Sequence, residues 1–320
     1  MKQILVMAPC RREHKEMLER AAQGSCHFNY NEHPSLSEIQ SAEIIIGEPD
    51  IGMIQNSTTL QWVQMTWAGA DLYTRSSGFP EQVTLTTASG AFGSVIAEYA
   101  FAGILSLFRH LPSYRKHQQL AVWQDCGVER TIEGSEVLIL GAGDIGENIA
   151  RRMQAFGASV TGIRRTVRDL PDGFDAMAGM NALDPLLSQA DIVVCCLPHT
   201  PETVRLFNRE RLLRMKPDAV LVNVGRGTLI DTNALAQVMA AGHLLGAVVD
   251  VTDPEPLPAD HPLWSLDRVL LTPHIAGPSF HHSPLTEDKI FRICSDNLAR
   301  YLAGEPLHNV ISWETGYRSR

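Results

Sequence analysis

Three polar side chains in the second half of the sequence have the types and positions needed for acid–base chemistry on a bound acid. Arg226 lies between two glycines at the end of an apolar run, Glu255 lies in a proline-rich turn, and His274 lies in 271-LTPHIAG-277. A guanidinium can form paired hydrogen bonds with a carboxylate. A histidine beside a carboxylate holds a proton that it can deliver to a reacting atom. Taken singly, each residue also fits a structural role, as a surface ion pair, a loop charge or a capped core histidine.

A glycine-rich loop precedes these residues and has the spacing of a dinucleotide-binding turn. The loop follows the apolar run 136-EVLIL-140 and reads Gly141-Ala142-Gly143-Asp144-Ile145-Gly146. The first glycine permits a tight turn, the second lets a pyrophosphate approach the backbone, and the third lets helix and strand pack closely. The N-terminus of the following helix offers free N–H groups to the phosphates. We predict that this loop binds a dinucleotide; the alternative is a turn whose glycines serve packing alone.

The residues that follow the next expected strand indicate which dinucleotide is bound. An acid at this position accepts hydrogen bonds from the ribose hydroxyls of NAD and would repel the 2′-phosphate of NADP. The chain instead has Arg164, Arg165 and Thr166. Arginine is suited to forked contacts with phosphate, and the threonine adds a hydroxyl donor. We therefore expect NADP(H) to be preferred, with NAD(H) possible; the alternative is a solvated pair of surface arginines.

Short apolar runs that alternate with amphipathic stretches must position these residues. The expected strands of the N-terminal part are 3-QILVMAP-9, 43-EIIIGEP-49, 62-WVQMT-66 and 83-VTLTTA-88. Those of the later part are 136-EVLIL-140, 158-ASVTGI-163, 191-DIVVCCL-197, 218-DAVLVNV-224, 245-LGAVVDV-251 and 268-RVLLT-272. Helices are expected over 94–120, with an end or kink at Pro112, and over 146–156, 232–241 and 284–303. The pattern predicts two α/β domains, the second with a doubly wound parallel sheet.

Composition limits the classes of protein to which the chain can belong. Its 320 residues, 44% of them hydrophobic, suffice for two domains with cores of their own. The formal net charge of −9 argues against a nucleic-acid binder, which normally carries a basic face. Apolar segments are too short for a membrane helix or a secretory signal. Six cysteines without a CxxC pair predict a reducing cytoplasmic compartment, and the histidine spacing predicts no metal site.

The motifs GAGDIG, VGRG, DVTDPEP and PHIAG follow one another in an order that resembles the D-isomer-specific 2-hydroxyacid dehydrogenase family. Three further segments are similar to parts of that family: 67-WAGAD-71 to its substrate-binding loop, 197-LPHTPET-203 to its loop beside the cofactor, and 301-YLAGEPLHNVI-311 to its C-terminal end. The resemblance covers most of the chain. The arginine-bearing cofactor loop is most similar to that of the NADPH-dependent glyoxylate/hydroxypyruvate reductase branch.

The resemblance implies a role for each candidate residue. Arg226 would bind the substrate carboxylate and polarise the keto oxygen, while His274 would be the acid in reduction and the base in oxidation. Glu255 would hydrogen-bond the imidazole, and Asp250 would contact the nicotinamide carboxamide. The expected substrate-binding residues are Trp67, Ala68, Gly69, Ala70, Arg226 and His274. The expected cofactor-binding residues are Gly141, Gly143, Asp144, Ile145, Gly146, Arg164, Arg165, Thr166, Leu197, Pro198, Thr203, Val224, Gly225, Arg226, Asp250, His274 and Gly277.

The loop at residues 67–70 is expected to complete a cradle for the substrate carboxylate through the backbone N–H groups of Ala68, Gly69 and Ala70. The alternative is a strand-to-helix turn in which Asp71 caps the helix, and both readings can hold together. His281 and His282, in 278-PSFHHSP-284, could line the substrate site, but a polar surface turn is the favoured interpretation.

The resemblance also implies the organisation of the domains. A substrate domain made of residues 1–98 and 285–320 would be flavodoxin-like, and residues 99–284 would form a Rossmann-like dinucleotide-binding domain. The helices at 94–120 and 284–303 would be the two crossings, with the active site in the cleft between the domains. Members of the family usually form homodimers through the dinucleotide-binding domain.

Three functions remain open from the sequence. The leading hypothesis is an NADPH-dependent reductase of a small 2-oxo acid such as glyoxylate or hydroxypyruvate. A second is an NAD-dependent dehydrogenase of a larger D-2-hydroxy acid. A third is a non-catalytic dinucleotide-sensing binding protein, and turnover by the purified protein separates it from the other two.

Overall fold

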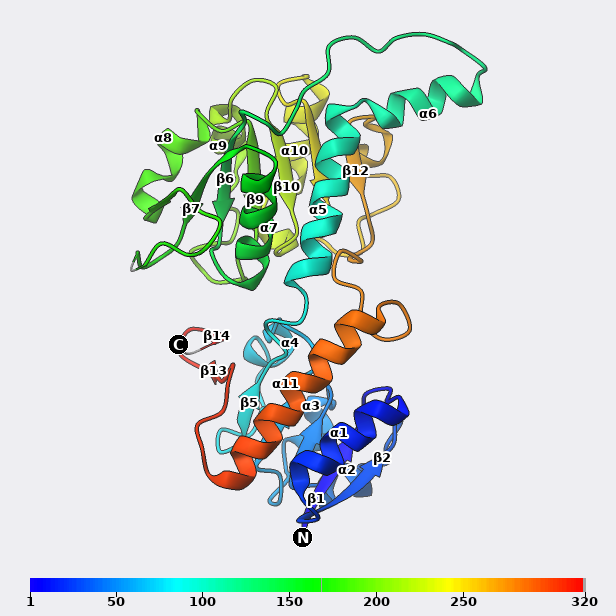
Figure 1. Ribbon diagram of the computed structural model, residues 1–320, viewed down its shortest axis with the longest axis vertical. Coiled ribbons are helices and arrows are strands. Elements are labelled where there is room, and N and C mark those ends of the chain that lie inside the picture. The colour runs from blue at the N-terminus through cyan, green and yellow to red at the C-terminus, as the bar shows by residue number, and fades with distance from the viewer. Residues whose placement is uncertain (168, 319–320) are drawn as a thin grey trace. The chain divides into compact units, whose positions relative to one another are not determined.

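The computed structural model describes residues 1–167 and 169–318 and divides into two compact units. Unit 1 comprises Met1–Phe92 and Pro278–Arg320, and unit 2 comprises Gly93–Gly277 (Figure 1). Both divisions fall a few residues before the expected boundaries at 98 and 284. The first falls earlier because helix α5 (Gly93–Phe108) is attached to unit 2 from its first turn, where Arg152 Nη2 donates to Ser94 Oγ at 3.0 Å.

Unit 1 is built on a five-stranded parallel sheet. Its strands are β1 (Lys2–Val6), β2 (Cys26–Tyr30), β3 (Ile44–Ile46), β4 (Trp62–Gln64) and β5 (Thr84–Thr86). The order β2-β1-β3-β4-β5 is that of a flavodoxin-like sheet. The sequence did not predict β2, because its segment CHFNY has no apolar run. This strand lies at the sheet edge and pairs with β1 alone, so it needs fewer apolar side chains than a central strand.

The helices of unit 1 cover this sheet and bring in the C-terminal part of the chain. They are α1 (Arg12–Ala22), α2 (Leu36–Ser41), α3 (Ile51–Ile54), α4 (Asp71–Thr74) and the long α11 (Pro284–Ala303), which confirms the helix expected at 284–303. Helix α11 packs beside α1, where the rings of His14 and Phe291 stack at 4.2 Å. The chain ends in the short pair β13 (Ile311–Ser312) and β14 (Tyr317–Arg318).

Unit 2 contains a seven-stranded parallel sheet. Its strands are β6 (Glu136–Leu140), β7 (Ser159–Ile163), β8 (Ala176–Ala178), β9 (Ile192–Cys195), β10 (Val220–Asn223), β11 (Gly246–Val249) and β12 (Val269–Leu271). The order is β12-β11-β10-β9-β6-β7-β8. Successive strands are therefore added to one side of β6 and then, from β9 on, to its other side, which makes the boundary between β6 and β9 the switch point of the sheet. All six expected strands are confirmed. The seventh, β8, is a three-residue edge strand and is too short to give a periodic signal.

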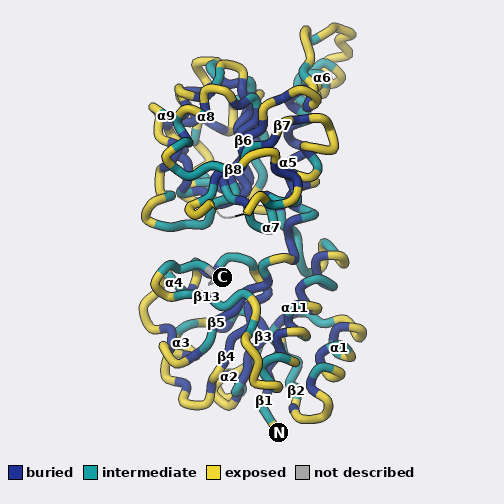
Figure 2. Tube along the Cα trace, turned by 60° about the vertical axis from the view of Figure 1, so that its left-hand side comes forward, coloured by how far each residue is buried: buried dark blue, intermediate teal, exposed yellow. Residues whose placement is uncertain are grey.

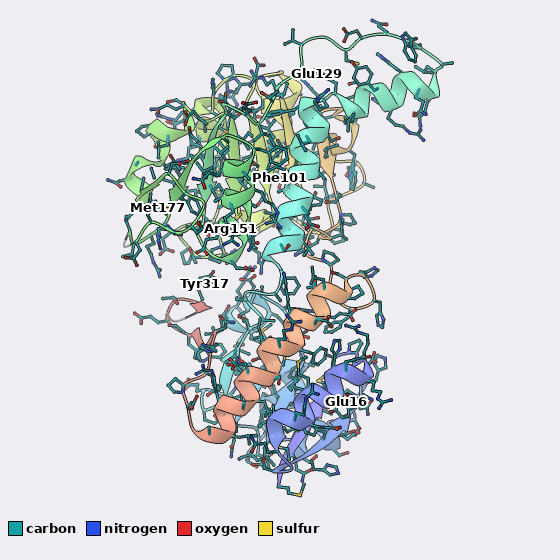
Figure 3. All side chains as sticks on the ribbon, in the orientation of Figure 1. Glu16, Phe101, Glu129, Arg151, Met177 and Tyr317 are labelled. Atoms are coloured by element: carbon teal, nitrogen blue, oxygen red, sulfur yellow. The ribbon has the colours of Figure 1, made fainter. Side chains whose placement is uncertain are left out.

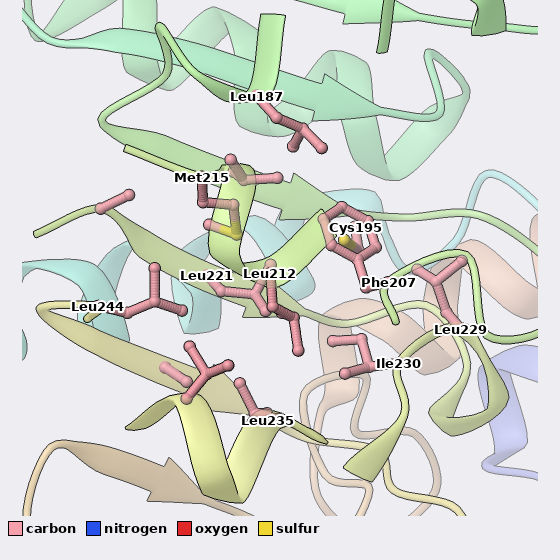
Figure 4. Close-up of a cluster of buried hydrophobic side chains, with 14 of the residues drawn as sticks. Leu187, Cys195, Phe207, Leu212, Met215, Leu221, Leu229, Ile230, Leu235 and Leu244 are labelled. Atoms are coloured by element: carbon pink, nitrogen blue, oxygen red, sulfur yellow. The ribbon is translucent and has the colours of Figure 1, made fainter. Parts of the chain in front are cut away.

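Helices pack on both faces of the unit 2 sheet (Figure 1). Besides α5 they are α6 (Leu111–Gln119), α7 (Asp144–Ala155), α8 (Leu183–Leu187), α9 (Arg209–Arg214) and α10 (Thr232–Ala240). One core layer fills the space between the sheet and the α9–α10 side with aliphatic side chains around Phe207, Leu221 and Leu235 (Figure 4). On the other side, the rings of Phe101 (labelled in Figure 3) and Phe156 meet edge-on at 5.1 Å and join α5 to the end of α7.

The single helix expected over 94–120 is wrong: the structure has two helices, α5 and α6, separated at Arg109 and His110. His110 adopts a left-handed conformation with φ 51° and is the N-cap of α6. Pro112 therefore falls in the first turn of α6, where its missing N–H costs no helical hydrogen bond. The break thus precedes the proline at which an end or kink was expected.

Helix α6 and the segment 120–131 after it form an arm that extends from the rest of unit 2 (Figure 1). Most of the arm is exposed (Figure 2). Trp123 is fully exposed, Val128 has a relative exposure of 93% and Leu120 one of 72%. These apolar side chains are concentrated on a short segment, which is unusual for a surface that faces only water. Among the described residues, no helix is both long and apolar enough to span a lipid bilayer.

Candidate active site

The glycine loop joins β6 to α7 at the switch point of the unit 2 sheet. Gly141 has φ 106°, and a Cβ there would lie 2.9 Å from the carbonyl oxygen of Cys196. A Cβ at Gly146 would lie 1.9 Å from the carbonyl oxygen of Gly141. Both positions therefore require glycine, and Gly143 is the extended N-cap of α7. The loop thus has the tight turn and close helix–strand packing that a dinucleotide pyrophosphate needs.

The side chain of Asp144 is occupied by contacts within unit 2. Its Oδ2 accepts a hydrogen bond from Gly93 N at 2.8 Å, and its Oδ1 accepts one from Asn148 Nδ2 at 3.1 Å. Asp144 therefore links the first turn of α7 to the first residue of α5. Because both carboxylate oxygens are used, the expected contact of Asp144 with a cofactor would be made by the backbone N–H of Asp144 at the helix N-terminus.

The residues after β7 present cations and no acid. The backbone N–H of Arg164 continues the sheet edge by donating to Ala178 O at 3.1 Å, and its Nη2 donates to Asp169 O at 2.6 Å. Arg164 Nε is buried and has no hydrogen-bond partner among the described residues. Arg165 and Thr166 are exposed. A buried guanidinium N–H without an acceptor among the described residues fits an anionic group at this position.

The segment Leu197–Thr203 packs against the end of β10. The Thr203 hydroxyl donates to Pro198 O at 2.8 Å and accepts from Thr200 N at 2.8 Å, which holds the segment in a compact turn. A Cβ at Gly225 would lie 2.7 Å from Leu197 O. The structure therefore brings together Leu197, Pro198 and Gly225, three of the expected cofactor-binding residues, at the C-terminal ends of β9 and β10.

Arg226 follows Val224 and Gly225 at the end of β10. Its Nη1 donates to Gly225 O at 2.9 Å, and a Cβ on the next residue, Gly227, would lie 1.9 Å from Thr252 O. The fully buried Asn223 fixes this turn, because its Nδ2 donates to Arg226 O at 3.1 Å and its Oδ1 accepts from Gly225 N at 3.2 Å. Sequence reasoning missed Asn223, although an amide at the end of an otherwise apolar strand is a signal of such a role.

His274 and Glu255 form the central contact of the site. His274 Nδ1 lies 2.6 Å from Glu255 Oε1, with relative side-chain exposures of 52% and 40%. His274 Nε2 has no hydrogen-bond partner in the described part of the chain. The backbone of His274 has φ 56°, which is uncommon for a residue with a side chain. The pair therefore leaves one ring nitrogen accessible while the carboxylate fixes the other.

Asp250 is buried beneath this turn and holds it in place. Its Oδ1 accepts from Thr272 Oγ1 at 2.6 Å and from Ile275 N at 2.8 Å, and its Oδ2 accepts from Ala276 N at 2.9 Å. The backbone N–H of His274 donates to Asp250 O at 2.9 Å. Three of the roughly four acceptor sites of the carboxylate are thus used within unit 2, and one on Oδ2 is left for the expected nicotinamide contact.

The residues expected to bind the substrate carboxylate lie in unit 1, directly after β4. The N–H groups of Ala68, Gly69 and Ala70 donate to no acceptor among the described residues. Ala70 is the N-cap of α4, and Asp71 is the first helical residue rather than the cap. Three consecutive donors without acceptors can bind a small anion. His281 and His282 are both exposed in the turn before α11.

The comparison with known families decides the identity of this fold and site. A model of the D-isomer specific 2-hydroxyacid dehydrogenase NAD-binding domain matches residues 101–276. The chain belongs to the D-isomer-specific 2-hydroxyacid dehydrogenase family. It is therefore an NAD(P)-dependent oxidoreductase, and its two parallel-sheet domains have the Rossmann-like fold expected of this family.

Individual members of the family support the assignment over the whole chain. A glyoxylate reductase from Pyrococcus furiosus is 30% identical over 264 residues, which are 80% of this chain and 77% of that protein. The crystal structure of a family member from Aeromonas salmonicida has a TM-score of 0.87 at 33% identity, covering 98% of this chain and 99% of that chain. A family member from Xanthobacter autotrophicus Py2, crystallised with NADPH and MES, has a TM-score of 0.83 at 27% identity, with 99% of both chains covered.

Proposed function

We propose that the protein reduces a small 2-oxo acid of the glyoxylate or hydroxypyruvate type to the D-2-hydroxy acid, with NADPH as the hydride donor. The observation that carries this proposal is the 2.6 Å contact between His274 Nδ1 and Glu255 Oε1 at the ends of β11 and β12. It provides a proton donor whose orientation is fixed by a carboxylate. The name of the Pyrococcus relative, glyoxylate reductase, supports this choice of substrate class.

The reaction adds a hydride to the carbonyl carbon and a proton to the carbonyl oxygen. Bound NADPH supplies the hydride. His274 delivers the proton from Nε2, and the ring keeps the proton on Nδ1 that it shares with Glu255. Arg226 forks onto the substrate carboxylate and polarises the keto oxygen, so negative charge that develops on that oxygen is stabilised before the proton arrives.

The substrate carboxylate is also bound by unit 1 in this proposal. The N–H groups of Ala68, Gly69 and Ala70, which lack acceptors among the described residues, donate to one of its oxygens. Trp67, which precedes the three donors and is 47% exposed, would contact the substrate from the same loop.

The preference for NADPH rests on the residues that follow β7. Arg164 has a buried Nε without an acceptor among the described residues, and Arg165 and Thr166 are exposed beside it. In this proposal these three residues bind the 2′-phosphate, while the loop 141–146 binds the pyrophosphate. The NADPH in the crystal of the Xanthobacter relative agrees with this choice.

We further propose that the protein is a cytoplasmic homodimer and that the arm of residues 111–131 is its interface. The arm belongs to unit 2 and exposes Leu120, Trp123 and Val128. Packing against a second copy would remove these side chains from water. All six cysteines are free thiols, in accord with a reducing compartment.

Steady-state turnover tests the proposed function. The consumption of NADPH and of NADH is followed by their near-ultraviolet absorbance, with glyoxylate, hydroxypyruvate and a larger 2-oxo acid as substrates. We expect the highest kcat/KM with NADPH and one of the two small acids. A preference for NADH and the larger acid would favour a D-2-hydroxyacid dehydrogenase of that kind. Dinucleotide binding without turnover on any acid would indicate a sensing protein.

A further inference from the structure

A carboxylate that the sequence analysis did not single out lies beside the loop that carries the three free N–H groups. Strands β3 and β4 pair in parallel with Ile46 opposite Gln64. Two residues further along both strands, this register sets Glu48 opposite Thr66. Glu48 is half-buried, and Thr66 is fully buried. The C-terminal edge of the sheet, where ligands bind in open α/β folds, therefore has an acid directly against the start of the loop.

Glu48 accepts every donor that the start of this loop offers. Its Oε1 accepts from Thr66 N at 2.7 Å and from Trp67 N at 3.2 Å, and the Thr66 hydroxyl lies 3.0 Å from both carboxylate oxygens. The two peptide groups of Thr66 and Trp67 are thus turned toward Glu48. Burial raises the pKa of Glu48, and these hydrogen bonds lower it in part.

The free donors begin where the contacts of Glu48 end. Thr66 and Trp67 donate to Glu48, whereas Ala68, Gly69 and Ala70 donate to no acceptor among the described residues. Ala68 O is held from the other side by Ser89 Oγ at 3.4 Å, and Trp67 O accepts from Ala88 N at 2.8 Å. Glu48 thus fixes the two peptide planes just before the free N–H groups, and the bonds to Trp67 O and Ala68 O fix the planes that carry the N–H groups of Ala68 and Gly69. The direction of the free donors depends on both sets of contacts.

We propose that Glu48 is a positioning residue for substrate binding: by binding the N–H groups of Thr66 and Trp67, it holds the start of the loop whose next three N–H groups bind the substrate carboxylate. This inference rests on the proposed function, because it needs the loop to bind the carboxylate of a 2-oxo acid. Glu48 itself does not touch the substrate. Its effect is on the affinity for the carboxylate and not on proton or hydride transfer.

The variants Glu48→Ala and Glu48→Gln separate positioning from charge. Alanine removes the acceptor for both N–H groups, whereas glutamine keeps one amide oxygen in nearly the same place. Asp50→Ala is the matched control, since Asp50 lies two residues further along and its side chain accepts from Gly52 N at 2.7 Å rather than from the loop. Each variant is assayed with NADPH and glyoxylate, and with methylglyoxal, which is a carbonyl substrate without a carboxylate.

In the Glu48→Ala protein we expect the KM for glyoxylate to rise by about 10-fold, which corresponds to about 1.4 kcal/mol of binding, with kcat nearly unchanged. The kcat/KM for methylglyoxal and the Kd for NADPH should stay at wild-type values. Glu48→Gln should restore most of the affinity, and Asp50→Ala should behave as wild type. An unchanged KM in Glu48→Ala, or an equal loss of activity with both substrates, would overturn the inference.

Binding of oxamate keeps the inference testable if the proposed function fails. Oxamate has the carboxylate of a 2-oxo acid but is not reduced, and its affinity for the NADPH-loaded protein is measured by calorimetry. Weaker oxamate binding to Glu48→Ala in a protein that turns over no 2-oxo acid would support the inference and reject the reductase. If the wild type reduces a 2-oxo acid but Glu48→Ala binds oxamate as tightly as the wild type does, the reductase would be supported and the inference about Glu48 rejected.

Discussion

His274 Nδ1 and Glu255 Oε1 lie 2.6 Å apart, although 19 positions separate the two residues along the chain. The contact joins the turn after β11 to the turn after β12, and these strands are neighbours in the sheet. Because a carboxylate accepts hydrogen bonds only, the proton between them lies on the histidine ring. The contact therefore fixes the orientation of the ring and leaves Nε2 for the substrate.

Replacing either member of this pair should affect the chemical step. His274→Gln removes the proton donor, and we expect kcat to fall by about 10³-fold, with the Kd for NADPH nearly unchanged. Glu255→Gln keeps the size of the side chain but removes the charge, and we expect a smaller loss of at least about 10-fold. Steady-state kinetics and fluorescence titration of NADPH measure the two effects. A His274→Gln protein with near wild-type kcat would rule out this residue as the proton donor.

The two arginines after β7 should determine the choice of cofactor. In the double variant Arg164→Asp, Arg165→Ser, an acid replaces the cation whose Nε is buried without an acceptor among the described residues. We expect the Kd for NADPH to rise by about 100-fold and that for NADH to fall or stay constant, because the 2′-phosphate loses its charge-assisted contacts. Titration with both dinucleotides checks this. Equal losses for NADPH and NADH would show that the arginines do not bind the 2′-phosphate.

Tyr99 should act on the site from a distance through Thr272 and Asp250. Thr272 Oγ1 donates to Asp250 at 2.6 Å, so at its 2.5 Å contact with Tyr99 it must accept the phenol proton. Burial raises the pKa of Tyr99 to about 12, so the phenol stays a donor in the assay range. For Tyr99→Phe we expect a loss of kcat of about 5-fold, in line with one hydrogen bond.

The control for this variant is Tyr301→Phe, since Tyr301 donates its phenol proton to Gln61 in unit 1. The Tyr301→Phe protein loses a phenol hydrogen bond, as Tyr99→Phe does, but its kcat should remain at the wild-type value. Equal kcat values for the two variants would mean that the Tyr99 hydroxyl has no part in positioning the His274 turn.

The start of helix α2 predicts a pH-dependent contribution to stability. Hydrogen bonds from Asn29, from Ser35 and from Asn31 lower the pKa of Glu38 from its ordinary value of 4.5 to about 2. The folded protein therefore binds this proton less readily than the unfolded chain. The stabilisation is complete above pH 4.5 and is lost as the pH falls toward about 2. Glu38→Gln should be less stable than the wild type at neutral pH, and the difference should shrink in acid.

Urea denaturation of both proteins between about pH 6 and about pH 3 measures this difference. The control is Glu16→Gln, because Glu16 pairs with Arg12 on the exposed surface of α1, where an ion pair contributes little. A difference between Glu38→Gln and wild type that stays constant over this range would contradict the prediction.

The exposed arm predicts the oligomeric state. We expect the wild type to sediment as a dimer and Trp123→Ser to shift toward the monomer, because the indole is fully exposed in the single chain. Trp264→Ser is the matched control, since Trp264 is also exposed and lies outside the arm. Sedimentation velocity at several protein concentrations measures both. A monomeric wild type, or equal behaviour of the two variants, would contradict the assignment of the arm as the interface.

The sequence predicted the parts of the fold that depend on strong local patterns. All six expected strands of unit 2 and helix α11 carry clear apolar periodicity, and the structure confirms them. Strands β2 and β8 were missed because edge strands need little apolar surface. The sequence placed the end of helix α5 at Pro112 and not at His110. A residue other than glycine that adopts a left-handed conformation leaves no signal in the sequence.

The candidate site was predictable where a motif carries the chemistry. Arg226, Glu255 and His274 stand in recognisable motifs, and the structure brings Glu255 and His274 into contact. The residues that support the site were not predictable, because their partners are distant in the chain. Glu48 reaches Thr66 only through the pairing of β3 and β4, and Thr272 reaches Tyr99 across 173 positions.

The most direct test of the account is the reduction of hydroxypyruvate by the purified protein with NADPH, with the product analysed by chiral chromatography. We predict that NADPH is consumed in proportion to the glycerate formed, that the glycerate is the D isomer, and that His274→Gln slows the reaction by about 10³-fold while still binding NADPH. Formation of the L isomer, or the absence of NADPH consumption with every small 2-oxo acid, would contradict the proposed reductase.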